Sequence, residues 1–372
     1  MNTPRRPLIP RPGVSRRKAF SSPLRSGTYQ AALRREMTKP RSVGRPYLPL
    51  VGSAFVIALA FFSLPSVLAT DLKDESVSVA ARAFPVTVRP DQKTIVEDPQ
   101  IEELLSVAPT SLAAAANFGE AAYRWLAVLI SDTPLYRQVA GVAGINNLFV
   151  TVYPGQRAEE VAASFGAKLG WGSKQRAEFL KQSRALEPEL SDGLFVPGTY
   201  FVGVTAPADV AGITHERFDS EIRARYSTTT AAQVPLEDAI TIASLLQREA
   251  GGWEDMRLIS GVIWNRLFKG MNLQIDATMQ YSKSTIAGGK GGWWPTPIPD
   301  DKNIRSSYNT YRQAGLPPGP IANPSIAAVV AALNPKKTDC LFYFHDQYGR
   351  FHCSPTYEGH VALLKKYYGQ GK

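Results

Sequence analysis

The spacing of apolar residues divides the chain into a long uncharged run and a region of shorter periodic segments. Leu48–Leu68 contains 21 residues without a charge, whereas the apolar residues that follow recur at intervals of two, or of three and four. A helix of that length rises 1.5 Å per residue and reaches about 31 Å, close to the thickness of a bilayer's hydrocarbon core. The pattern therefore predicts one transmembrane helix at 48–68, followed by an α+β protein.

Between residues 147 and 205 the pattern predicts a strand, two helices and a second strand. Leu148–Tyr153 is rich in β-forming residues and ends at Pro154-Gly155, and apolar residues in Gln156–Leu169 then follow a helical i, i+3, i+4, i+7 spacing. A second β-rich run lies around 194–204. This order resembles a LysM-like module, a small fold associated with glycans that contain N-acetylglucosamine. A generic α+β packing unit would explain the pattern equally well.

Two helices are expected on either side of Gly251-Gly252. The first ends at Glu249 or Ala250 and is mostly apolar, and the second covers Trp253–Phe268. Burial can raise the pKa of a carboxyl group at the end of an apolar helix, which suits a general acid. Most helical glutamates are solvated surface residues, so Glu249 is only a weak candidate on this pattern alone.

The segments after this helical hairpin carry polar and rigid features. Gln274, Asp276 and Thr278 alternate in a segment expected to be extended, where they form either a solvated face or a hydrogen-bonding edge for a polar substrate. The rings of Trp293-Trp294 either stack on sugars or fill the core. Residues 315–324 contain four prolines and two glycines, which fix the backbone at little entropic cost on folding.

The net charge of +10 comes from the N-terminal segment. Residues 1–47 hold 12 Lys+Arg and one acid, a net of +11, and the remainder holds 30 bases and 31 acids, a net of −1. The tail is poor in apolar residues and is expected to be disordered and cytoplasmic, which places the rest in the periplasm. A single-pass inner-membrane anchor explains the charge without nucleic acid, and a 47-residue leader is long for the alternative, a cleaved signal peptide. Residues 69–146 are expected to be a linker with short helices.

The two cysteines lie on the exported side of this predicted topology. Cys340 and Cys353 flank two β-rich strands joined by a turn near Asp346–Gly349. If His345 pairs with Arg350, both cysteines lie on the same face of the hairpin. An exported compartment permits a disulfide there, and the alternative is a pair of buried thiols.

Five motifs follow one another in the second half of the chain: Ala243–Glu249 (ASLLQRE), Asn265–Leu267 (NRL), Met271–Asp276 (MNLQID), Tyr308–Tyr311 (YNTY) and Gly315–Pro324. In their order and spacing, the chain from Leu148 to His360 resembles the YceG-like (MltG-type) endolytic murein transglycosylases. The resemblance implies a catalytic domain over 206–372 in which Glu249 is catalytic. Ala277 stands where the family usually has proline, and changes at Phe351 and Gly359 put a role for the closing hairpin in doubt. The candidates for binding sugars are Asn265, Gln274, Asp276, Thr278, Tyr308, Asn309, Thr310 and Tyr311.

The resemblance implies that the protein cleaves the β-1,4 bond between N-acetylmuramic acid and N-acetylglucosamine in nascent peptidoglycan and leaves 1,6-anhydro ends. Glu249 would act first as acid and then as base, and Asp276 is the second candidate acid or an electrostatic partner. Glycan strands, the membrane and peptidoglycan synthases are the expected partners. No cofactor or metal is expected: His215-Glu216 opens like a zinc motif, but Asp219 stands where HExxH needs its second histidine. The alternative function is an inactive glycan-binding scaffold.

Overall fold

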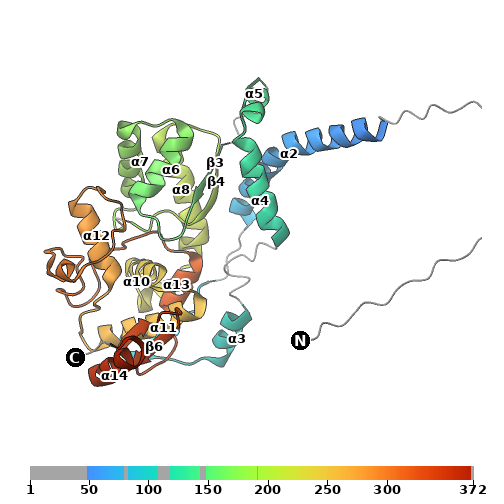
Figure 1. The fold of residues 1–372 in the computed structure, drawn as a ribbon. Coiled ribbons are helices and arrows are strands. Elements are labelled where there is room, and N and C mark those ends of the chain that lie inside the picture. The colour runs from blue at the N-terminus through green and yellow to red at the C-terminus, as the bar shows by residue number, and fades with distance from the viewer. Residues whose placement is uncertain (1–47, 79–82, 108–117, 143–147, 191, 370–372) are drawn as a thin grey trace, which may run out of the picture. The chain divides into compact units, whose positions relative to one another are not determined.

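The computed structural model describes residues 48–78, 83–107, 118–142, 148–190 and 192–369 (Figure 1). The chain divides into two compact units, Met1–Val56 and Ile57–Lys372, and the second contains every element below except the first residues of α2. The prediction of a disordered basic tail at 1–47 lies outside the described residues.

Helix α2 (Leu48–Ser78) contains the predicted helix and continues beyond it. No helix in the described parts of the chain is long and apolar enough to cross a membrane, so the transmembrane helix expected at 48–68 is not found. Near the end of this run Leu68 and Ala69 are instead buried by protein, in a cluster with Ala127 and Phe149.

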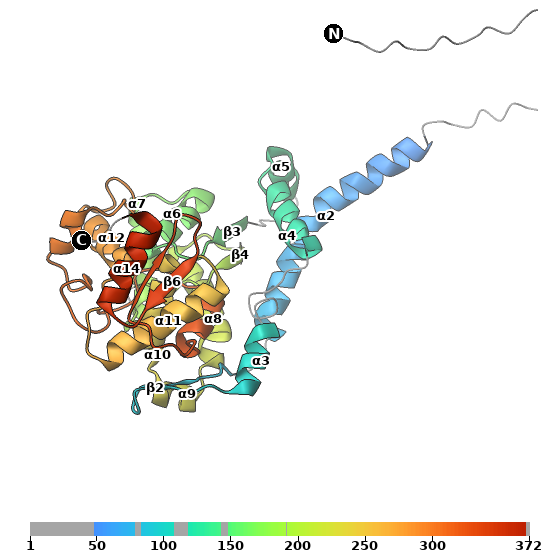
Figure 2. The same ribbon diagram turned by 60° about the horizontal axis from the view of Figure 1, so that its bottom comes forward.

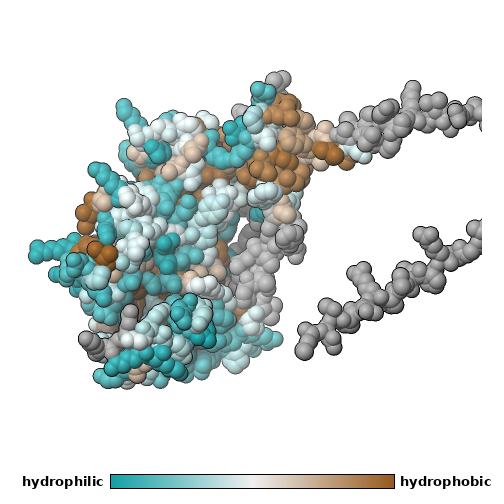
Figure 3. Space-filling view, in the orientation of Figure 1, coloured by the Kyte–Doolittle hydropathy of each residue, from teal (hydrophilic) through white to brown (hydrophobic). Residues whose placement is uncertain are grey.

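Short elements occupy much of the segment expected to be a linker. Strands β1 (Val88–Arg89) and β2 (Thr94–Ile95) form an antiparallel pair, followed by α3 (Pro99–Val107), α4 (Phe118–Ser131) and α5 (Pro134–Val142). Apolar residues gather on the surface over α4 and α5 (Figure 3). The exposed large side chains there include Trp125, Leu129, Leu135 and Val139.

The predicted strand–helix–helix–strand order is confirmed. Strand β3 (Leu148–Val152) pairs antiparallel with β4 (Gly198–Val202), and α6 (Ala158–Leu169) and α7 (Ser173–Leu186) lie between them in sequence (Figure 1). Their core is largely aromatic, with Phe165, Trp171, Phe179, Phe195 and Tyr200 in ring contact. Helix α8 (Pro207–Glu221) packs against α7.

Helix α10 (Leu236–Glu249) is the centre of the following region, after η1 (Arg223–Arg225) and α9 (Thr228–Gln233). Residues 239–246 of α10 are all buried, and the helix packs against α13 (Ile326–Leu333) and α11 (Trp253–Phe268) (Figure 1). The predicted bounds of α11 and the Gly251-Gly252 break are confirmed. Such extensive burial explains why α10 shows a nearly continuous apolar pattern rather than a single stripe.

The remaining elements are α12 (Asp276–Ile286), η2 (Pro299–Asn303), the antiparallel pair β5 (Phe342–His345) and β6 (Phe351–Ser354), and α14 (Tyr357–Tyr368), which packs on that hairpin (Figure 2). The predicted hairpin register is wrong by one residue, because His345 pairs with Phe351 rather than Arg350. The Asp346 carboxylate accepts hydrogen bonds from the backbone N–H groups of Tyr348 and Arg350, and so keeps Arg350 in the turn.

Candidate active site

Glu249 lies in the last turn of α10, where three segments distant in sequence meet. Ala250 leaves the helix in an extended conformation, and the chain turns through the two glycines into α11. Glu249 Oε1 accepts a hydrogen bond from the backbone N–H of Ala277, 3.3 Å away, and its Oε2 accepts one from the Tyr343 hydroxyl, 3.2 Å away. The carboxyl group is thus oriented by α12 on one side and by β5 on the other.

Burial raises the pKa of the Glu249 carboxyl above its usual range. The N–H of Ala277 and the hydroxyl of Tyr343 oppose the rise because both donate to the ionised form, and a charge on His345 opposes it too, whereas the Asp276 carboxylate adds to it. The side chain of Arg248, the residue before Glu249, lies over the ring of Trp294, with its guanidinium carbon 3.8 Å from the ring centroid. The net shift of the Glu249 pKa is upward, which is the direction that a general acid requires.

The segment of Gln274, Asp276 and Thr278 is not extended throughout, which corrects the sequence prediction. Asp276 is the first residue of α12, so the period-two alternation ends there and Thr278 turns into the core. Gln274 and Asp276 are exposed, and Gln274 has a positive φ of 52°, a conformation uncommon for a residue other than glycine. The Tyr311 hydroxyl donates to Asp276 Oδ1 over 2.6 Å. Two of the three predicted polar side chains therefore remain accessible, and Asp276 is close enough to Glu249 to influence its pKa.

Asn309 and Thr310 are buried as well as Thr278, and the polar groups of these three predicted sugar-binding residues form hydrogen bonds within the protein. Asn309 donates to the carbonyls of Lys302 and Ile304, and Thr310 Oγ1 accepts the N–H of Ile275. Thr278 donates to the carbonyl of Ile275, and its hydroxyl lies 3.0 Å from that of Thr310. These contacts hold the loop 302–311 against the start of α12, so the buried trio positions Asp276 and Tyr311.

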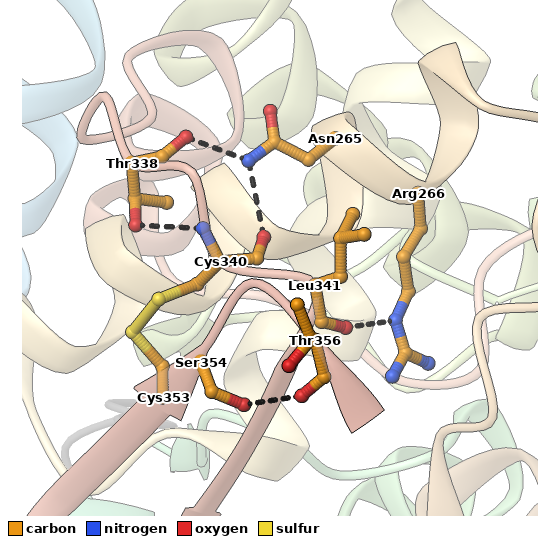
Figure 4. Close-up of a disulfide and its surroundings, with 8 residues drawn as sticks. All are labelled: Asn265, Arg266, Thr338, Cys340, Leu341, Cys353, Ser354 and Thr356. Atoms are coloured by element: carbon orange, nitrogen blue, oxygen red, sulfur yellow. Dashed lines mark hydrogen bonds between the residues drawn. A yellow bond between two sulfur atoms is a disulfide. The ribbon is translucent and has the colours of Figure 1, made fainter. Parts of the chain in front are cut away.

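Asn265 is also bound to the backbone rather than turned toward Glu249. Its Nδ2 donates to the carbonyls of Thr338 and Cys340, while Arg266 Nε donates to the carbonyl of Leu341 (Figure 4). Cys340 is joined to Cys353 by a disulfide, which settles the choice that the sequence left open. Helix α11 therefore holds the segment 338–341 that leads into β5.

Sequence reasoning missed Tyr343, His345 and Asp255. Tyr343 contacts the catalytic candidate directly, and His345 Nε2 lies 2.8 Å from Asp255 Oδ2, which also accepts the N–H of Gly251. A signal was present in the alternation of Leu341–His345, which places residues 343 and 345 on one side of a strand, but no pattern says which partner that side faces.

Tyr308 and the two tryptophans, which the sequence offered as possible sugar-binding rings, contact other side chains of the protein. The ring of Tyr308 lies 4.7 Å from that of Tyr281, and the guanidinium of the buried Arg157 lies 4.6 Å from the ring of Trp293. Trp294 donates to Glu160 Oε2 over 3.2 Å in addition to its contact with Arg248. Both tryptophans are partly buried and connect the Gly-rich loop to α6 and α10.

A cluster of possible metal ligands lies elsewhere, at Glu187, His215 and Asp219, whose ligand atoms are all within 4.8 Å of one another. Arg223 forms ion pairs with both carboxylates, which supplies the positive charge that a cation would otherwise bring. The neighbouring cavity measures about 10 Å³, close to the minimum for one water molecule. The arrangement fits a salt-bridge network better than a metal centre.

Comparison with known proteins identifies the family of the chain. Residues 104–366 match the model of the YceG-like family. The endolytic murein transglycosylases of Streptococcus pneumoniae (strain D39) and Bacillus subtilis (strain 168) are 31% identical over 158 residues and 29% identical over 239 residues. The matches cover 42% and 59% of this chain but 28% and 64% of the relatives, so the chain spans less than two thirds of each.

A solved structure supports the fold. The crystal structure of a YceG-like protein from Listeria monocytogenes superposes with a TM-score of 0.51 at 24% identity, over 61% of this chain and 81% of that one. The five motifs that carry the resemblance, at 243–249, 265–267, 271–276, 308–311 and 315–324, all lie within the matched range 104–366. The resemblance drawn from them is confirmed, and the chain belongs to the YceG-like family.

Proposed function

We propose that the protein is an endolytic murein transglycosylase, which cleaves the β-1,4 bond between N-acetylmuramic acid and N-acetylglucosamine in peptidoglycan strands. The observation that carries the proposal is the buried carboxyl of Glu249, which accepts hydrogen bonds from two neutral donors and whose pKa burial raises above its usual range. The names of the two relatives support the same reaction.

The first step needs the protonated form of Glu249. Its proton passes to the glycosidic oxygen as the bond from that oxygen to C1 of the muramic acid breaks, and positive charge develops on C1 and the ring oxygen. The resulting carboxylate then accepts the proton of the 6-hydroxyl while O6 bonds to C1. A 1,6-anhydro end forms, Glu249 is protonated again, and no water is consumed.

This route explains how one acid/base residue suffices. Most glycosidases use two carboxylates, one of which activates water or attacks the sugar. Here the nucleophile belongs to the substrate, and an oriented intramolecular group has the advantage of proximity that a second catalytic carboxylate would otherwise create. Asp276, hydrogen-bonded to Tyr311 and exposed, acts as the electrostatic partner of the positive transition state and keeps the pKa of Glu249 high.

The test is digestion of purified peptidoglycan, with mass spectrometry of the products. The wild type is expected to release anhydro-muropeptides, and Glu249→Gln to lose activity by roughly 10²- to 10⁴-fold, the range for general acid–base catalysis. Hydrolysis would give products heavier by one water, and an inactive scaffold would give none. Either result from the wild type, or full activity in Glu249→Gln, contradicts the proposal.

We also propose that the catalytic region works in the periplasm, attached to the inner membrane and beside the synthases that supply its glycan strands. The support is the basic segment 1–47 ahead of an uncharged run, together with a disulfide in the C-terminal hairpin. Fractionation of cells tests the location of the protein.

The β3–α6–α7–β4 unit is proposed to bind glycan as a LysM-like module. Pull-down of variants at the surface of α6 and α7 with peptidoglycan tests whether this unit binds glycan.

A further inference from the structure

The closing hairpin, whose role the sequence put in doubt, contacts the catalytic candidate. Tyr343 comes from the middle of β5, and its hydroxyl donates to Glu249 Oε2 from 94 positions further along the chain. Tyr343 pairs directly with Cys353 across the hairpin, and its ring stacks on Phe351 with centroids 5.8 Å apart. Burial raises the pKa of Tyr343 well above its ordinary value, so the hydroxyl remains a donor over the whole working pH range.

We propose that Tyr343 is a positioning residue for Glu249, and that the disulfide-closed β5–β6 hairpin is part of the active site because it holds the Tyr343 hydroxyl in place. This inference rests on the proposed function, since it assigns a task within the same reaction.

Three attachments fix the hairpin relative to Glu249. The disulfide joins Cys340, just before β5, to Cys353 in β6, and Asn265 and Arg266 hold the backbone of residues 338–341 (Figure 4). At the other end of β5, His345 is bound to Asp255 in the first turn of α11. Helix α11 follows α10 directly after the two-glycine turn. The helix that holds the hairpin of Tyr343 is therefore connected to the helix that carries Glu249.

The chemical consequence concerns the state of Glu249 after it has given up its proton. A tyrosine hydroxyl aimed at Oε2 stabilises the new carboxylate more than the acid, because hydrogen bonds to charged groups are the stronger kind. The same bond fixes the direction of the carboxyl, which must face the glycosidic oxygen and later the 6-hydroxyl. The titratable or charged groups that influence Glu249 are Asp276, Tyr343, His345, Arg248 and Tyr311.

Tyr343→Phe in the full-length chain tests the proposal, with Tyr348→Phe as the matched control because Tyr348 is 73% exposed in the hairpin turn. Loss of a hydrogen bond to a charged group is expected to lower kcat by about 10- to 100-fold with little change in KM. The alkaline limb of the kcat profile is expected to move to higher pH, since a group that lowers the pKa of Glu249 has been removed. The remaining product should still be the 1,6-anhydro form.

A second variant keeps the test decisive if Tyr343→Phe folds poorly. Replacing both Cys340 and Cys353 by serine leaves the tyrosine in place but releases the hairpin, so part of the same loss and the same pH shift are expected. Combined with Tyr343→Phe, the cysteine changes should cause no further loss of kcat, because both act through one hydrogen bond.

The outcomes separate this inference from the proposed function. Wild-type kcat and pH profile in Tyr343→Phe, or a fully additive effect of the cysteine changes, would overturn the role of Tyr343 while anhydro products from the wild type still stood. Failure of the wild type to form anhydro products would overturn the proposed function itself.

Discussion

The sequence and the structure predict different roles for Asn265, and a substitution can distinguish them. The sequence makes it a sugar-binding candidate, whereas the structure shows its Nδ2 donating to the carbonyls of Thr338 and Cys340 at 2.8 and 3.1 Å. Asn265→Ala removes both hydrogen bonds, and the two partly buried carbonyl groups lose their side-chain donor. At 0.5–1.5 kcal/mol for each bond, the loss of stability is about 1–3 kcal/mol.

That loss can be measured by thermal unfolding. For domains of 150–250 residues each kcal/mol lowers Tm by roughly 2–4 °C, so about 2 kcal/mol corresponds to roughly 4–8 °C. Asn303→Ala, at an exposed position in η2, is the control and should leave Tm unchanged. In digestion assays below the Tm, Asn265→Ala should keep its KM for glycan strands. An unchanged Tm together with a large rise in KM would refute the structural role and restore the sugar-binding one.

The remaining predictions concern pH. Asp276→Asn removes a charge that raises the pKa of Glu249, so the alkaline limb of kcat should move to lower pH in rate profiles. Ala277→Pro removes the 3.3 Å hydrogen bond to Glu249, and the same profiles should show the opposite shift. Burial raises the pKa of Asp192 to about 7, so its contribution to stability is present below about 4 and is lost as the pH rises through 7. In Asp192→Asn, the free energy of unfolding measured with urea should depend less on pH between about 4 and 7 than in the wild type.

Local patterns predicted most of the helices around the site. Trp253–Phe268 is helical at both predicted ends, because the glycines before it and its own apolar spacing are local signals. The predicted register of the β5–β6 hairpin was wrong because the hydrogen bonds of one side chain, Asp346, determine which residues form the turn. Such a contact depends on three-dimensional geometry, and alternation of strand residues does not determine it.

The polar residues of the site show a different limit of sequence reasoning. Asn309 and Thr310 have the composition expected of a sugar-binding loop, yet both are buried and bound to the backbone. A buried polar side chain that satisfies a loop and an exposed one that awaits substrate look alike in a sequence, because both are polar residues in an irregular segment. Tyr343 is the converse case, since its partner is 94 positions away and no local period predicts the contact.

The backbone N–H of Ala277 opposes the effect of burial on the pKa of Glu249. Ala277 occupies the first turn of α12, where backbone N–H groups lack partners within the helix and the helix dipole favours a negative charge. The Glu249 carboxyl accepts one of these N–H groups, so α12 favours the ionised form that burial opposes. A proline at this position would also suit the first turn of a helix but has no N–H to donate. If proline stood at this position, Tyr343 would be the donor that remains to the Glu249 carboxyl.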